Sequence, residues 1–124
     1  MNEGTSDRER EIWQQRATEL LRDAENATNC RHTRMTACFD AIYLKLLLVA
    51  SAAGSTRSSG RRDHPEPSVI VAGATACGLD DDETGEVLEL REAVTALRYE
   101  PGALPGNLLR LLAIARHLVK SVGR

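Results

Sequence analysis

Residues 31–53 read RHTRMTACFDAIYLKLLLVASAA, a stretch without proline or glycine. Its apolar residues fall on two sets of helical positions, which are Met35, Phe39, Ile42, Leu46 and Val49 in the first set and Ala37, Ala41, Leu44 and Leu48 in the second. Because an α-helix repeats every 3.6 residues, the two sets lie on different faces. A helix that is apolar on several faces is usually buried on several faces. The pattern therefore predicts a long central helix that ends at Gly54.

Two shorter amphipathic patterns flank this stretch. A first helix is predicted from about Ser6, which has capping-box spacing with Glu9, to residues 26–29. A third helix is predicted to follow Pro67 and to end at Gly78, because proline suits a first helical turn and glycine a helix end. The small residues of this segment, VAGATACG, are interpreted as a site of close helix packing.

Two more helices complete the prediction. Asp80 and Glu83 have capping-box spacing and begin a fourth helix, which is expected to run to about Tyr99. Prolines and glycines at 101–106 then force a turn. The last helix has apolar residues at helical spacing, namely Leu108, Leu111, Leu112, Ala115, Leu118, Val119 and Val122.

Composition agrees with a helical protein. Apolar residues make up 42% of the 124 residues and aromatic residues only 3%, which favours packed helices over strands. We therefore predict an all-α fold, an up-and-down bundle of about five helices with a long central helix. One domain is expected over residues 1–124, with flexible ends at 1–5 and 122–124 and a loop at 54–66.

Charge and hydropathy exclude two classes of protein. The net charge of −2 argues against a protein that coats nucleic acid. The longest apolar run, Leu46 to Ala50, is too short to cross a bilayer, and the N-terminus lacks the apolar stretch of a secretory signal. The sequence thus predicts a cytoplasmic protein without a membrane role.

The most basic segment of the chain is the predicted loop. It contains four basic side chains, Arg57, Arg61, Arg62 and His64. Such a cluster is a candidate nucleic-acid-binding or phosphate-binding site. The favoured alternative is a solvated connection, since no aromatic residue is present for base stacking.

No complete catalytic or metal-binding motif is present. The three histidines, His32, His64 and His117, are far apart in sequence, and no two have the i, i+4 spacing that places imidazoles on one helix face. The acidic run at 80–82 is interpreted as a helix N-terminus rather than a metal site. We expect neither a metal nor a cofactor.

Four further side chains are candidates for unusual environments. Cys38 and Cys77 are predicted to be small buried hydrophobes, whereas the positive charges that follow Cys30 would lower its thiol pKa. Asp40 lies between apolar residues of the central helix and is predicted to be a buried polar group. A buried carboxylate needs a partner, and Arg91 or Arg98 could supply it. A structural ion pair is favoured over a catalytic role.

The order of these features resembles the HEPN superfamily of prokaryotic helical bundles. The resemblance covers about residues 31–120 and rests on the central helix RMTACFDAIYLKLLLVA, the loop with DHPEP, then GLDDDE and LREAVTALRYEPG. Active members are metal-independent ribonucleases with an arginine, a polar residue after it, and a histidine four to six positions beyond the arginine. Arg91 and Tyr99 match the edges of that motif, but Glu92 follows the arginine and no histidine precedes Tyr99.

The resemblance implies two alternative functions. The first is a non-catalytic interaction module, a homodimer or the partner of a nucleotidyltransferase in a toxin–antitoxin or defence-type system. The second is a divergent endoribonuclease acting on RNA through Arg91, Arg98 and Tyr99, with His64 or His117 brought in from elsewhere. Because the family histidine transfers a proton, its absence favours the first alternative.

Overall fold

The computed structural model describes residues 7–52, 66–96 and 106–121. These ranges form five α-helices and contain no strand: α1 (Asp7–Glu25), α2 (Arg31–Ala52), α3 (Pro67–Cys77), α4 (Asp81–Ala96) and α5 (Leu108–Ser121). The all-α class, the five helices and the long second helix are confirmed. Ser6 of the predicted first cap, the loop at 54–65 and the predicted end of α4 at 97–99 lie outside the described ranges.

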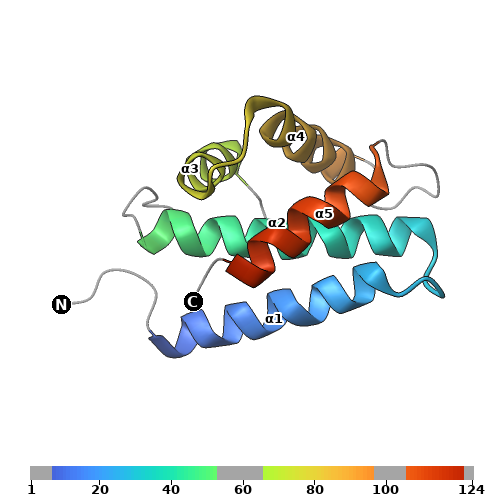
Figure 1. The fold of residues 1–124 in the computed structure, drawn as a ribbon, viewed down its shortest axis with the longest axis horizontal. Coiled ribbons are helices and arrows are strands. Elements are labelled where there is room, and N and C mark those ends of the chain that lie inside the picture. The colour runs from blue at the N-terminus through green and yellow to red at the C-terminus, as the bar shows by residue number, and fades with distance from the viewer. Residues whose placement is uncertain (1–6, 53–65, 97–105, 122–124) are drawn as a thin grey trace.

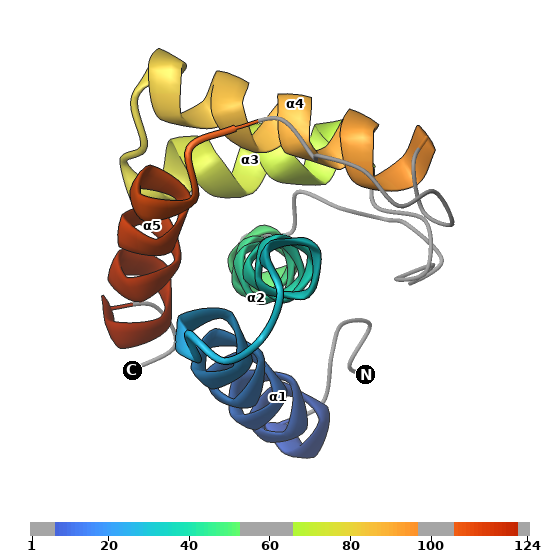
Figure 2. The ribbon, with the colours of Figure 1, turned by 90° about the vertical axis from the view of Figure 1, so that its right-hand side faces the viewer.

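Helix α2 is the centre of the molecule. Viewed along its axis in Figure 2, it is surrounded by α1, α3 and α5. Both predicted apolar faces are used, because the buried residues of α2 include Met35, Ala37, Cys38, Phe39, Ala41, Ile42, Tyr43, Leu46, Leu47, Leu48 and Ala50. The prediction that this helix is buried on several sides is confirmed.

Helix α1 runs beside α2, joined to it by a short turn (Figure 1). It buries Ala17, Leu20, Leu21 and Ala24, which recur at the three- and four-residue spacing of one face of an amphipathic helix. The Arg34 Nε of α2 donates a hydrogen bond to the Ala24 carbonyl at 2.8 Å. This bond satisfies one of the carbonyls that the end of α1 leaves without a helical partner.

Helix α3 approaches α2 very closely at Gly73. A Cβ atom at this position would lie 2.7 Å from the Leu46 carbonyl oxygen and 2.8 Å from the Leu46 Cβ. Only glycine leaves space for this contact, which confirms close packing as the role of the small-residue segment. Gly78, at φ 81°, ends α3, and its N–H donates to the Thr75 carbonyl.

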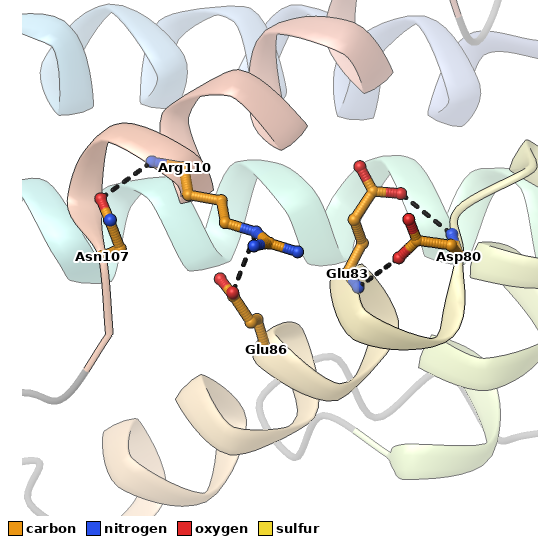
Figure 3. Close-up of polar contacts among 5 residues, drawn as sticks. All are labelled: Asp80, Glu83, Glu86, Asn107 and Arg110. Carbon is orange, nitrogen blue, oxygen red and sulfur yellow. Dashed lines mark hydrogen bonds and ion pairs between the residues drawn. The ribbon is translucent and has the colours of Figure 1, made fainter.

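The predicted capping box at the start of α4 is confirmed. The Asp80 N–H donates to Glu83 Oε1 at 2.9 Å, and the Glu83 N–H donates to Asp80 Oδ1 at 2.7 Å (Figure 3). The two side chains thereby satisfy two amides at the helix N-terminus. Helices α3 and α4 together lie across α2 rather than along it (Figure 2), so the bundle is less regular than a strictly up-and-down arrangement.

Helix α5 packs on α2 and α1 through Leu111, Leu112, Ile114, Ala115 and Leu118. Its first turn is capped by Asn107, whose Oδ1 accepts from the Arg110 N–H at 3.2 Å (Figure 3). Charged contacts fix its two ends. Arg110 Nε lies 2.9 Å from Glu86 Oε2 of α4, and Arg116 forms an ion pair with Glu25 at the end of α1.

Candidate functional site

The polar group of greatest chemical interest lies where α2, α4 and the start of α3 meet. Tyr43 of α2 is buried, and its hydroxyl accepts a hydrogen bond from the Glu66 backbone N–H at 3.2 Å. Burial raises the pKa of the Tyr43 phenol, and this is the largest effect. The hydrogen bond from the Glu66 N–H lowers this pKa, and the negative charge of the Glu66 carboxylate raises it. The positive charge of Arg91 has the smallest effect and lowers it. Arg91 therefore acts electrostatically on a buried hydroxyl group.

Of the three residues Arg91, Arg98 and Tyr99 that are predicted as catalytic, Arg91 is the one that the described ranges include. Its Nη1 lies 2.8 Å from Oε2 of the adjacent Glu92, an ion pair in which the arginine side chain is 22% exposed and the glutamate is largely exposed. Arg98 and Tyr99, the other two catalytic candidates, lie outside the described residues. The same is true of the predicted nucleic-acid-binding residues Arg57, Arg61, Arg62 and His64.

The two described histidines lie on other helices than Arg91. His117 is exposed on α5. His32 is in the first turn of α2, and its Nδ1 is buried without a hydrogen-bond partner among the described residues. Neither described histidine therefore shares a helix with Arg91, whereas the ribonuclease motif has a histidine four to six positions beyond the arginine.

The prediction that Asp40 is buried is wrong. Its side chain is exposed on α2. The sequence did contain a signal for this, because Thr33, Thr36 and Asp40 recur at i, i+3 and i+7 and so form a narrow polar stripe on an otherwise apolar helix. The carboxylate therefore does not need the compensation that a buried charge would require.

The buried charged residue of α2 is instead Lys45, which is 2% exposed. Burial lowers the pKa of the Lys45 ammonium, the Arg10 charge lowers it further, and Cys77 raises it. Sequence reasoning missed this residue. The available signal was its position four residues after Ala41 and three after Ile42, which places it on the buried side.

The three cysteines occupy three different environments. Cys38 is fully buried, and burial raises its pKa to about 12, so it behaves as the predicted small hydrophobe. Cys77 is partly buried, with its pKa also raised by burial. The exposed Cys30 has a lowered pKa, and the largest cause is its 3.3 Å hydrogen bond with the Thr33 hydroxyl, not the arginine charges that the sequence suggested.

Two further observations concern groups of metal ligands and membrane-spanning helices. Within residues 7–52, 66–96 and 106–121, no group of three or more His, Cys, Asp or Glu side chains is placed so that it could hold a metal ion. Over the same part of the chain, every helix is too short or too polar to span a bilayer.

Comparison of the chain with protein-family models, with curated proteins and with solved structures finds no match. The expected function therefore depends on the geometry above and on the resemblance of the sequence motifs.

Proposed function

We propose that this protein is a non-catalytic interaction module of the HEPN-like type, and that a partner protein binds the outward face of α3. The observation that carries the proposal is that α3 contains no charged residue over its whole length. Its outward side chains are nevertheless exposed; they are Pro67, Ser68, Val71, Thr75 and Ala76. The outward sides of α1, α4 and α5 all carry charged residues.

Depletion of charged residues is the compositional signal of the buried centre of a protein interface. A partner that covers this face would not remove any charged side chain of α3 from water, and so would not incur the free-energy cost of burying a charge. Val71, which is 47% exposed, would contribute apolar area to the interface. The small side chains around it would let a partner helix approach closely, as Gly73 does on the inner side of α3. The α3 face therefore suits a helical or flat protein surface.

The type of partner is proposed from the resemblance alone. A nucleotidyltransferase of a prokaryotic toxin–antitoxin or defence-type system is the partner that the HEPN-like motifs imply. Such a system acts in the cytoplasm, so a cytoplasmic location is part of this proposal.

A capture experiment tests this proposal. The full chain, carrying an affinity tag, is incubated with extract of its host, and bound proteins are identified by mass spectrometry. We expect a nucleotidyltransferase to be retained by the wild type and by the exposed α1 variant Gln15→Glu, but not by the double variant Val71→Glu, Ala76→Glu. Retention that is the same for all three proteins, or the absence of any specific partner, would contradict the proposal.

One observation favours the ribonuclease as a second candidate. The Arg91 charge opposes the rise in the pKa of the buried Tyr43 phenol, and a positive charge within electrostatic range of an RNA phosphate would stabilise the charge that develops during cleavage. Total RNA is incubated with wild type, Arg91→Ala and Tyr43→Phe. Cleavage by the wild type that both variants lose would support this candidate. No cleavage, or equal cleavage by all three, would remove it.

A further inference from the structure

Gly85 differs from the other described glycines because no contact or backbone angle within the chain requires it. Gly73 leaves space for the Leu46 backbone, and Gly78 and Gly106 have positive φ angles of 81° and 119°. Gly85 lies inside α4, is not among the glycines with positive φ, and has no atom of the described residues within 4 Å of an added Cβ. Glycine inside a helix costs stability relative to alanine. The fold therefore gains nothing from this missing side chain, which leaves open space on the surface of α4.

The helix surface around Gly85 is acidic. Asp81 and Asp82 precede it by four and three residues and Glu89 follows it by four, so all three are its neighbours on the surface of α4. Their side chains are exposed, and none forms an ion pair with a described residue. The helix dipole favours the two aspartates in the first turn but not Glu89 in the middle of the helix. The open space at Gly85 therefore lies between carboxylates that the chain does not neutralise.

The spacing of these carboxylates fits the width of a helix. From the rise of an α-helix, Asp81 and Glu89 are about 12 Å apart along the axis of α4, with Gly85 midway between them. An α-helix with its side chains is about 10–12 Å wide. A second helix that crosses α4 at Gly85 would therefore have a carboxylate on each side of it, within reach of long basic side chains.

Helix α3 lies beside α4 on the same side of α2 (Figure 1, Figure 2). Thr75 of α3 and Gly85 of α4 are each about one turn from the connection between the two helices, so they lie at a similar level. A helix that crosses α4 at Gly85 therefore continues over the uncharged outward face of α3, which includes Val71 and Ala76. One crossing helix would cover both surfaces.

We propose that the partner contacts α3 and α4 with a single helix, which crosses α4 at Gly85 and carries lysine or arginine residues on both sides of the crossing. These residues pair with Asp81, Asp82 and Glu89, while the part of the helix that covers α3 is small and apolar. The inference rests on the proposed function in one respect, namely that this helix belongs to the protein that binds α3. It adds the chemistry of the partner surface, a basic helix.

Peptide binding tests the charge of the partner helix. The probe is an alanine-rich helical peptide of about 20 residues with lysines at i, i+4 spacing, and the control peptide has glutamate in place of each lysine. Fluorescence anisotropy at low ionic strength measures the affinity of each peptide for the full chain. We expect the wild type to bind the lysine peptide about tenfold more tightly than the glutamate peptide, and this preference to shrink as salt is added.

Gly85→Leu tests the crossing point and separates it from the stability of the fold. Leucine favours a helix more than glycine does, so the midpoint of urea unfolding should rise. The added side chain blocks the close approach, so the affinity for the lysine peptide should fall about tenfold. Thr95→Leu adds bulk at an exposed position of α4 about three turns away and should leave the affinity unchanged.

The carboxylates have a test matched in charge. Asp82→Lys, Glu89→Lys should weaken binding of the lysine peptide about tenfold, because like charges then oppose it. Glu11→Lys, Glu19→Lys makes the same change of net charge at exposed positions of α1, on the other side of α2 (Figure 1), and should bind as the wild type does.

Three results would overturn the inference: a wild type that binds both peptides equally, an affinity of Gly85→Leu equal to that of the wild type, or equal weakening by the α1 and α4 charge variants. The test of the proposed function is separable from these. Capture of a nucleotidyltransferase by Gly85→Leu as well as by the wild type would contradict the crossing helix and leave the α3 proposal standing. The expected peptide results without any captured nucleotidyltransferase would remove that partner and support the basic-helix site on α4.

Discussion

The contact between α2 and α3 and the contact between α4 and α5 are of contrasting kinds. Helix α3 meets α2 at Gly73, where the two backbones are so close that a methyl group does not fit. Helix α5 meets α4 through one ion pair, Arg110 with Glu86, whose side chains are 44% and 28% exposed. The first contact depends on shape and the second on charge in partial solvent. Substitutions and salt should therefore affect the two contacts very differently.

The largest effect is expected at the α2–α3 contact. Gly73→Ala forces a methyl group against Leu46 and should lower the free energy of unfolding by about 2–3 kcal/mol. The matched control is Gly85→Ala in α4, where no atom lies within 4 Å of the added Cβ, and it should raise stability by about 0.5–1 kcal/mol. Urea unfolding followed by circular dichroism measures both. A stability for Gly73→Ala equal to that of the wild type would break the comparison.

The part of the core around Cys38 should respond to alkaline pH. The Cys38 pKa is about 12 in the folded protein against 9.0 ordinarily, so above pH 9 the unfolded chain loses a proton that the folded chain keeps. Stability then falls as pH rises, by about 1.4 kcal/mol per pH unit between these values. The pKa values of Tyr43 and Lys45 are also shifted and contribute to the total pH dependence. The contribution of Cys38 is therefore taken as the slope of the wild type minus the slope of Cys38→Ala. The exposed Cys30→Ala should keep the wild-type slope, and equal slopes for all three proteins would contradict a buried Cys38 thiol.

A smaller effect is expected at the start of α4. Asp80→Ala removes the oxygen that accepts from the Glu83 N–H and should cost about 1 kcal/mol of unfolding free energy. Asp82→Ala, in the same first turn but outside the capping box, should lower the unfolding free energy by only a few tenths of that amount, because it removes a favourable interaction of a negative charge with the helix dipole. Thermal unfolding of the two variants compares them. Equal costs would mean that charge near the helix end matters and the cap geometry does not.

The smallest effect belongs to the α4–α5 ion pair. A double-mutant cycle with Arg110→Ala and Glu86→Ala should give a coupling energy of about 0.5 kcal/mol, because both side chains are partly solvated. The coupling should shrink as salt is added. A larger coupling that does not change with salt would place this contact in the same class as the Gly73 contact.

The sequence predicts the helices well because their signals are local. Apolar spacing identifies α1, α2 and α5, and the Asp80–Glu83 spacing identifies the start of α4. The sequence predicts less well which side chains of α2 are buried and which are exposed. That helix is apolar on most sides, so the signals that separate the exposed Asp40 from the buried Lys45 are weak: a narrow polar stripe for Asp40 and the spacing from Ala41 and Ile42 for Lys45.

Contacts between helices depend on tertiary packing and were harder to predict. The small residues around Gly73 indicated close packing, but the helix that they pack against follows only from the structure. The same is true of the way α3 and α4 cross α2 and of the electrostatic effect of Arg91 on Tyr43, because each relates α2 to helices later in the chain. At the candidate site, therefore, the sequence predicts Arg91 as a candidate but does not predict its effect on Tyr43.

Native-state hydrogen exchange tests the central claim that stability is concentrated around α2 and decreases toward α4. Amides of α2 between Ala37 and Leu48, which are enclosed by α1, α3 and α5, should exchange only by global unfolding. Amides in the last turns of α4 should exchange by local opening and much faster. Equal protection of α2 and α4 across increasing denaturant would contradict the account.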